Sequence, residues 1–300
     1  MIHPSGNGQD SPGLEAHLRT PSHRRQTGKT PMTETRCAPA IALVVALIAW
    51  LPTAASAQDA ELAQTLTNPI ADLVSVPFQI NRDRGFGADR DGWRTTLNIQ
   101  PVYPIRLSDD WTLISRTIVP VIRQKNVVPG SSQTGLGDIL QSFFLSPAGA
   151  GSDGGLIWGA GVAFGLPTAS EDALGTGKWT IGPTVAALRI DGAFTYGALL
   201  NHLWSVGGDR DRANVNQSFV QPFLSYTSPA AVTLTASAEA LYDWEREALA
   251  VPVNLTAARL VRIGGQPVSL QAGLRYWAKS PEGGPRGFGF RIGTTILFPR

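Results

Sequence analysis

Apolar and polar residues alternate along most of the chain that follows residue 73. In the first such stretch the apolar residues occupy every second position: Val74, Val76, Phe78 and Ile80. The same alternation runs through residues 232–242 and again through residues 288–296. A period of two places the two sets on opposite faces of a β-strand. The apolar face would point to a core in a soluble sandwich and to lipid in a membrane barrel.

The length of these segments favours the membrane barrel. Strands that cross a membrane need about 9–11 residues, whereas strands of soluble proteins centre on about 5–6. Twelve segments follow the pattern, most with 12 to 14 residues: 74–82, 93–105, 111–123, 135–146, 155–167, 178–189, 193–206, 216–227, 231–244, 248–261, 267–279 and 287–298. We therefore predict an all-β protein, a transmembrane antiparallel outer-membrane β-barrel of about 12 strands over residues 74–298. Segments 135–146 and 193–206 alternate poorly, which leaves their register open.

The connections between the segments alternate in length, as in barrels with short periplasmic turns and longer outer loops. The short connections are 190–192, 228–230 and 262–266. The longer, polar ones are 83–92, 124–134, 168–177, 207–215 and 280–286. Two connections, 147–154 and 245–247, depart from this alternation. An even number of strands places both ends of the barrel on the periplasmic side.

Several tryptophans lie near the ends of the predicted strands: Trp93, Trp111, Trp179, Trp244 and Trp277. Such positions are typical of the aromatic girdles at the two membrane interfaces. Ordinary strand aromatics, the alternative interpretation, would be scattered along the strands.

The N-terminal part of the chain predicts export. Within residues 32–57, Arg36 supplies a positive charge, residues 38–51 form an apolar run, and Ala55-Ser56-Ala57 resembles a signal-peptide cleavage site before Gln58. The alternative, a membrane anchor, needs about 20 apolar residues, and this run has 14. We expect residues 1–31 to be a disordered extension from a mis-assigned start. Residues 58–73 are an N-terminal segment and a candidate lumen plug.

Composition supports these assignments. A mean hydropathy of −0.02 argues against a helical membrane bundle, and 43% hydrophobic residues argue against disorder. Removing residues 1–57 takes away five of 25 basic and three of 23 acidic residues, which leaves no net charge and no basic patch for nucleic acid. It also removes Cys37, so the mature chain has no thiol for a disulfide or a metal. No cofactor is expected.

Several short motifs resemble those of one family of bacterial outer-membrane proteins. They include Asn68-Pro-Ile-Ala-Asp-Leu, Leu107-Ser-Asp-Asp-Trp-Thr-Leu-Ile, Gly135-Leu-Gly-Asp-Ile, Leu174-Gly-Thr-Gly-Lys-Trp, Asn201-His-Leu-Trp-Ser, Gln221-Pro-Phe-Leu-Ser-Tyr, Tyr242-Asp-Trp-Glu and Arg275-Tyr-Trp-Ala. From about Asn68 onward, the chain resembles the meta-pathway phenol-degradation barrel family, whose members are called transporters and are sometimes mislabelled neuromedin U. The resemblance implies an outer-membrane barrel that takes up small molecules, aromatic compounds among them. It transfers no binding residues.

A barrel hydrolase is the main alternative, because an outer-membrane phospholipase also has twelve strands. Such an enzyme needs a serine and a histidine within hydrogen-bond reach. The mature chain has one histidine, His202, and the next serine, Ser205, lies three residues away on the opposite face of the strand. A serine on a neighbouring strand, as the partner of His202, remains an open alternative. We predict that the protein is not an enzyme; a structural barrel without transport is the third possibility.

Inward-facing polar residues predict a charged band inside the barrel. Residue counting places Glu239, Asn254, Arg275 and Arg291 at one height on four successive strands, with Asn98 two strands further around. Arg94 and Asp243 also fall on inward-facing positions of their strands. An excess of arginine over glutamate predicts an anion-favouring or carboxylate-orienting constriction. The alternative is a set of mixed charges that only satisfy one another.

Together these observations predict a passive channel or transporter in the outer membrane of a Gram-negative cell. The expected partners are the lipid bilayer of the outer membrane, a small-molecule solute and, during insertion, the barrel-assembly machinery. No nucleic acid is expected.

Overall fold

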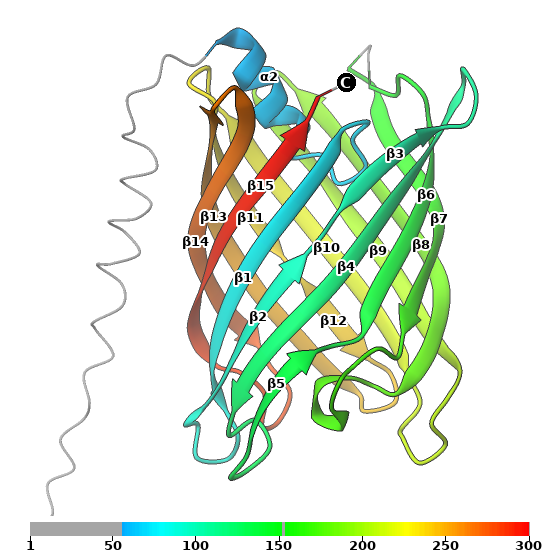
Figure 1. The fold of residues 1–300 in the computed structure, drawn as a ribbon, viewed down its shortest axis with the longest axis vertical. Coiled ribbons are helices and arrows are strands. Elements are labelled where there is room, and N and C mark those ends of the chain that lie inside the picture. The colour runs from blue at the N-terminus through cyan, green and yellow to red at the C-terminus, as the bar shows by residue number, and fades with distance from the viewer. Residues whose placement is uncertain (1–55, 152–153, 300) are drawn as a thin grey trace, which may run out of the picture. The chain divides into compact units, whose positions relative to one another are not determined.

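The computed structural model describes residues 56–151 and 154–299, and within them the chain forms a closed antiparallel barrel (Figure 1). The strands are β1 (Val74–Phe86), β2 (Gly92–Ile99), β3 (Val102–Arg106), β4 (Trp111–Lys125), β5 (Ser132–Leu136), β6 (Ile139–Pro147), β7 (Leu156–Leu166), β8 (Lys178–Asp191), β9 (Phe194–Gly208), β10 (Asn216–Thr227), β11 (Val232–Ala238), β12 (Ala240–Asp243), β13 (Ala248–Ile263), β14 (Gln266–Lys279) and β15 (Gly287–Phe298). The helices are α2 (Ala57–Thr65) and the short 3-10 helix η2 (Asp172–Leu174). No helix in the described ranges is long and apolar enough to span a membrane. The predicted extension 1–31, and all but the last two residues of the predicted signal 32–57, lie outside the described residues.

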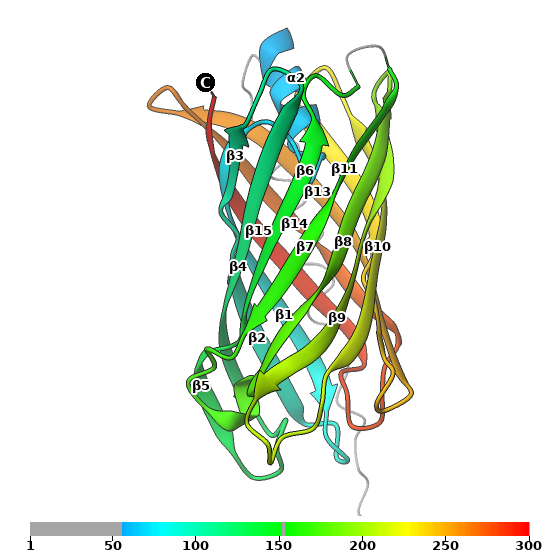
Figure 2. The same ribbon diagram turned by 90° about the vertical axis from the view of Figure 1, so that its right-hand side faces the viewer.

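The fifteen strands occupy twelve positions around the barrel, and we call each position a stave. This number confirms the predicted fold class. Three staves consist of two consecutive strands each, namely β2–β3, β5–β6 and β11–β12. The ring closes because β15 pairs with β1 and β9 pairs with β10, and every pairing is antiparallel. Figure 2 shows the tilt of the strands that closure requires.

Prolines account for two of the interruptions within staves. Pro101 separates β2 from β3, and Pro252 lies opposite Glu239, which separates β11 from β12. A proline has no N–H to donate to the ladder. The chain still bonds across both breaks, because the Glu239 amide donates to the Pro252 carbonyl at 3.0 Å and the Thr117 amide donates to the Pro101 carbonyl at 3.1 Å. Hydrogen bonding between neighbouring staves therefore continues past both interruptions.

The apolar set of each strand faces outward, as the alternation predicts. On adjacent staves Leu234 and Leu255 are 53% and 61% exposed, while Asn254 is fully buried. A water-soluble sandwich would show the opposite pattern. The outward face is therefore apolar and the lumen polar, which is the arrangement of a transmembrane barrel.

One sector of the inner wall is apolar instead. Ile114, Phe144, Ile157, Leu188 and Leu199 face inward there and are almost fully buried. Large apolar residues on the inner as well as the outer face erase the period of two, which explains why the sequence leaves the register of residues 135–146 and 193–206 open.

The barrel has a turn end and a loop end. We use turn end for the end that carries α2, the start of β1 and the end of β15, and loop end for the other (Figures 1 and 2). Trp111 and Trp158 contact each other edge-to-face at the turn end, and Trp179 and Trp244 are exposed near the loop end. Trp277 differs from the prediction, because it lines a cavity inside the barrel.

Helix α2 lies against the turn end. Ser56 caps it, with the Asp59 amide donating to the Ser56 hydroxyl at 3.1 Å. The Asp59 carboxylate also pairs with Arg262 of β13 at 2.8 Å. Burial acts to raise the pKa of the Asp59 carboxyl, but the hydrogen bonds from Ser56 and the Arg262 guanidinium outweigh it, and the pKa lies below its usual range.

The chain between α2 and β1 enters the lumen. Ile70 is only 3% exposed and packs into the apolar sector of the inner wall. Gly159 leaves room for it, since a Cβ at that position would lie 3.1 Å from the Ile70 Cδ1. On the other side Ala63, Ala71 and Leu73 pack against Leu260 and Leu297. Residues 66–73 therefore occupy the turn end of the lumen, held by apolar contacts on two sides.

The outward assignment can be tested at Ala236, which lies in β11 between Leu224 and Leu255 of the neighbouring strands. Ala236→Arg should lower the free energy of unfolding in lipid vesicles by roughly 2–4 kcal/mol, because the guanidinium would face hydrocarbon. Ser237→Arg is the matched control, since its side chain faces the lumen and should cost far less. Equal losses at both positions would contradict the assignment.

Candidate functional site

The centre of the lumen holds a network of buried charged side chains. Glu239, at the break between β11 and β12, accepts hydrogen bonds from Arg275 of β14 at 2.7 Å and from Arg291 of β15 at 2.8 Å. All three side chains are less than a fifth exposed. Such short contacts between ionised groups are charge-assisted and strong.

A second carboxylate, Asp83 of β1, completes the network. Its Oδ1 accepts from Arg275 Nε at 3.1 Å and from Trp277 Nε1 at 2.8 Å. Residue 83 was predicted to lie in a loop, but β1 continues to Phe86 and carries Asp83 inward. The polar residue Asp83 lies two positions after Asn81, and this continued alternation past residue 82 is the signal that could have shown it.

Two amides fix the arginines from the side. Arg275 Nη1 donates to Asn254 Oδ1 at 3.0 Å, and Arg291 Nε donates to Asn81 Oδ1 at 2.7 Å. Four of the predicted lumen residues, Glu239, Asn254, Arg275 and Arg291, are thus joined in one network. Within it two arginines meet two carboxylates, so its charges compensate each other. Removing one partner of such a buried pair costs about 3–5 kcal/mol.

The three other predicted residues lie apart from this network. Arg94 and Asn98 of the β2 strand line the lumen on the loop-end side. Arg94 Nε donates to Gln124 Oε1 at 2.7 Å, and its guanidinium lies 5.2 Å from the Phe86 ring centroid. Asp243 is buried at the loop end of β12. It accepts from the Glu245 and Arg246 amides and pairs with the Arg246 side chain at 2.9 Å, so it organises the turn that follows.

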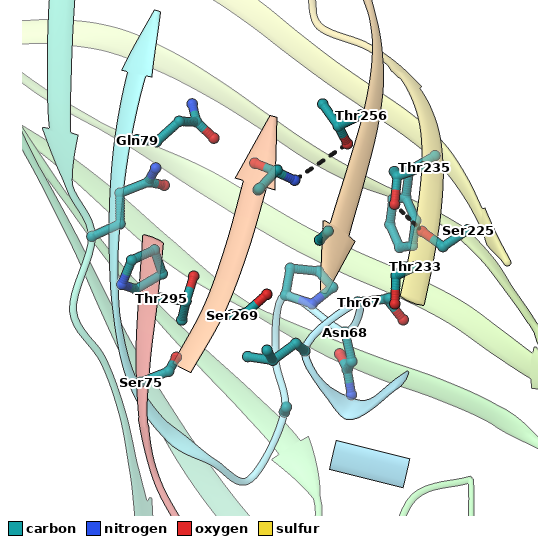
Figure 3. Close-up of a pocket in the computed structure, with 18 of the residues that line it drawn as sticks. Thr67, Asn68, Ser75, Gln79, Ser225, Thr233, Thr235, Thr256, Ser269 and Thr295 are labelled. Carbon is teal, nitrogen blue, oxygen red and sulfur yellow. Dashed lines mark hydrogen bonds between the residues drawn. The ribbon is translucent and has the colours of Figure 1, made fainter. Parts of the chain in front are cut away.

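A polar cavity of about 270 Å³ lies between the network and residues 66–73. We call it the turn-end cavity. Figure 3 shows its hydroxyl-rich wall, with Thr67 and Asn68 of the N-terminal segment opposite side chains of several strands. The hydroxyls include Ser75, Ser225, Thr233, Thr235, Thr256 and Thr295. Some are bonded to each other, such as Ser225 to Thr235 at 2.8 Å, and Arg291 lies on the cavity wall toward the network.

A second cavity, of about 420 Å³, lies toward the loop end. This loop-end cavity is mixed in character. Its charged residues are Asp83, Arg94, Arg116, Glu239 and Arg275. Its apolar and aromatic residues include Phe86, Ile118, Leu140, Leu199, Phe219 and Trp277. A cavity of this composition suits a small solute that has both an apolar body and a polar group.

The two cavities meet at a neck. Gln79, Gln100, Arg116, Leu199 and Gln221 line both of them. Arg116 Nη2 donates to Gln100 Oε1 at 2.9 Å. The sequence analysis missed Arg116, because its inward neighbours on β4 are Ile114 and Ile118 and the inner face of that strand does not appear polar.

His202 has a serine partner, although not the one nearest in sequence. Its Nδ1 lies 2.7 Å from the hydroxyl of Ser218, on the neighbouring strand β10. Trp244 Nε1 also donates to that hydroxyl at 2.9 Å, and Trp204 lies against the imidazole with 4.2 Å between ring centroids. Among the described residues, His202 Nε2 is buried without a hydrogen-bond partner. A hydrolytic triad would place an acid or amide at that nitrogen.

The described ranges contain no group of three or more His, Cys, Asp and Glu side chains placed to hold a metal ion.

Comparison with known proteins supports the fold. No family model matches the chain, and no curated protein matches its sequence. Among solved structures, the chain is similar to an outer membrane channel from Pseudomonas putida F1, with a TM-score of 0.58 and 16% identity over 75% of this chain and 94% of that chain. It is less similar to the NanC porin, with a TM-score of 0.45 and 10% identity over 76% and 100% of the two chains. Outer membrane phospholipase A from Escherichia coli gives a TM-score of 0.42 and 13% identity over 74% and 96%. At 16% identity, the likeness to the Pseudomonas putida channel shows the outer-membrane barrel fold alone.

Proposed function

We propose that the protein is an outer-membrane channel for the passive uptake of small organic molecules, closed at its turn end by residues 66–73. The observation that carries this proposal is the lumen itself. It consists of a polar cavity and a mixed cavity that share a neck, and a segment that is not part of the barrel wall covers one end. A purely structural barrel has no need of such a covering segment.

The orientation follows from the same argument. The predicted export signal ends at Ala57, the first residue of α2, so the turn end faces the periplasm and the loops face outward. Phe298 ends the final strand, and a terminal aromatic at that position resembles the signal for outer-membrane insertion. A solute then enters through the loop-end cavity and meets residues 66–73 last.

The solute class rests on the resemblance to the phenol-degradation barrels and on the loop-end cavity. Phe86, Phe219 and Trp277 give that cavity aromatic walls, while the arginines provide polar contacts. Small aromatic compounds that carry a polar group fit this combination.

Deleting residues 58–72 tests the closed state. The deletion removes α2 and Ile70, so the single-channel conductance of the refolded barrel in planar bilayers should rise several-fold above that of residues 58–300. Glu61→Gln is a control in the same helix, because its exposed side chain does not hold the segment in place. Equal conductance with and without the segment would contradict the proposed closure, and no conductance in either form would favour a structural barrel.

The central network should set ion selectivity. Replacing Arg275 and Arg291 together by Gln should raise relative cation permeability, because Glu239 and Asp83 keep their charges and lose their partners. Reversal potentials in a salt gradient measure this, and Glu239→Gln should shift them in the opposite direction. If reversal potentials stay unchanged while the barrel still migrates as a folded, heat-modifiable species, the network is structural only.

A barrel hydrolase is the second candidate, favoured by the 2.7 Å contact of His202 with Ser218. Against it, Trp244 already engages the hydroxyl, and no acid orients the imidazole within the described residues. We expect no hydrolysis of phosphatidylcholine or p-nitrophenyl esters by the refolded barrel. Ester hydrolysis that disappears in Ser218→Ala would make the protein an enzyme.

A further inference from the structure

Arg116 lies at the neck between the two cavities described above. It extends from β4 into the neck, and three of the four other neck residues are glutamines. Gln79, Gln100 and Gln221 carry no charge. The neck is therefore a ring of amides around a single guanidinium.

The charge of Arg116 has no counter-charge in contact with it. Its one hydrogen bond within the described part of the chain goes to the neutral Gln100, and no carboxylate there lies within 4.0 Å of it. The charge of Glu239 reaches Arg116, but that carboxylate is already held by Arg275 and Arg291. Six charged residues line the two cavities in the described ranges, and four of them are arginines.

An unpaired guanidinium inside a barrel is costly unless water or a bound anion satisfies it. Arginine has five N–H donors in a planar fork that matches both oxygens of a carboxylate. Gln100 accepts a hydrogen bond from one donor of Arg116. The other donors have no hydrogen-bond partner in the described residues, and Arg116 lines both cavities. Paired arginines such as Arg275 hold the wall together, whereas Arg116 is available to a ligand.

The surroundings of Arg116 indicate the rest of the ligand. Ile118 lies on the same face of β4, and Leu140, Leu199 and Phe219 also line the loop-end cavity. An apolar body can rest against these side chains while its anionic group reaches the guanidinium.

We propose that Arg116 is an anion-binding residue that holds the carboxylate of a small, apolar organic acid at the neck. This inference deepens the proposed function by naming the class of solute, and its transport aspect rests on that function. The binding site itself does not require conduction.

Benzoate binding to the refolded, full mature barrel tests the site by titration calorimetry. Arg116→Gln should weaken benzoate binding about tenfold or more, as expected for the loss of a charge-assisted contact. Arg123→Gln is the matched control, because it removes the same charge from the exposed face of the same strand and should leave the affinity unchanged. Benzyl alcohol, which lacks the carboxylate, should bind weakly and equally to all forms.

Arg116→Lys distinguishes a loss of binding from a loss of folding. It keeps the positive charge and loses the fork, so its affinity for benzoate should lie between those of the parent and Arg116→Gln. Unchanged affinity in Arg116→Gln, or an equal loss in Arg123→Gln, would overturn the proposal. A barrel that binds benzoate through Arg116 but never conducts would refute the channel and leave the site standing. A barrel that conducts but binds benzoate equally well without Arg116 would support the channel and refute the site.

Discussion

Backbone hydrogen bonding is the constraint on which the rest of this structure depends. Hydrocarbon offers no partner for an N–H or a carbonyl, so a sheet in a membrane must close on itself. The pairing of β15 with β1 closes the ring, and the ladder between each pair of neighbours gives every stave a defined register. Each side chain then has a settled height and facing, and this places Glu239, Arg275 and Arg291 within hydrogen-bond distance although they come from three different staves.

The same constraint explains why so much of the fold could be predicted. Period-two alternation and segment length suffice for the strands, and parity with residue counting brings Glu239, Asn254, Arg275 and Arg291 to one wall. The misses have physical causes. Asp83 was not predicted as a lumen residue because β1 extends beyond its apolar alternation. Arg116 was not predicted because its inward neighbours on β4 are isoleucines. Neither the contact of Ile70 with the wall nor the 2.7 Å contact of His202 with Ser218 has any local sequence signal, since each joins segments that only the closed barrel brings together.

The arginines of the lumen fall into two groups that sequence alone cannot separate. Arg275 and Arg291 each contact a carboxylate and an amide, so their charge is used within the wall. Arg94 and Arg116 donate their side-chain hydrogen bonds to glutamines, and in the described ranges neither pairs with a carboxylate. Electrostatic character in such a lumen therefore depends less on how many arginines it contains than on which of them have acidic neighbours.

In the proposed function, the burial of Ile70 also bears on how often the turn end opens. Full burial of an isoleucine side chain stabilises a contact by roughly 1.5–3 kcal/mol, and each 1.4 kcal/mol corresponds to a tenfold change in population. In the proposed function, residues 66–73 cover the turn end through contacts on two sides, and Ile70 is the residue that packs into the apolar sector of the inner wall. A smaller residue at position 70 would then raise the fraction of molecules with an open turn end about tenfold or more, without any change to the barrel wall.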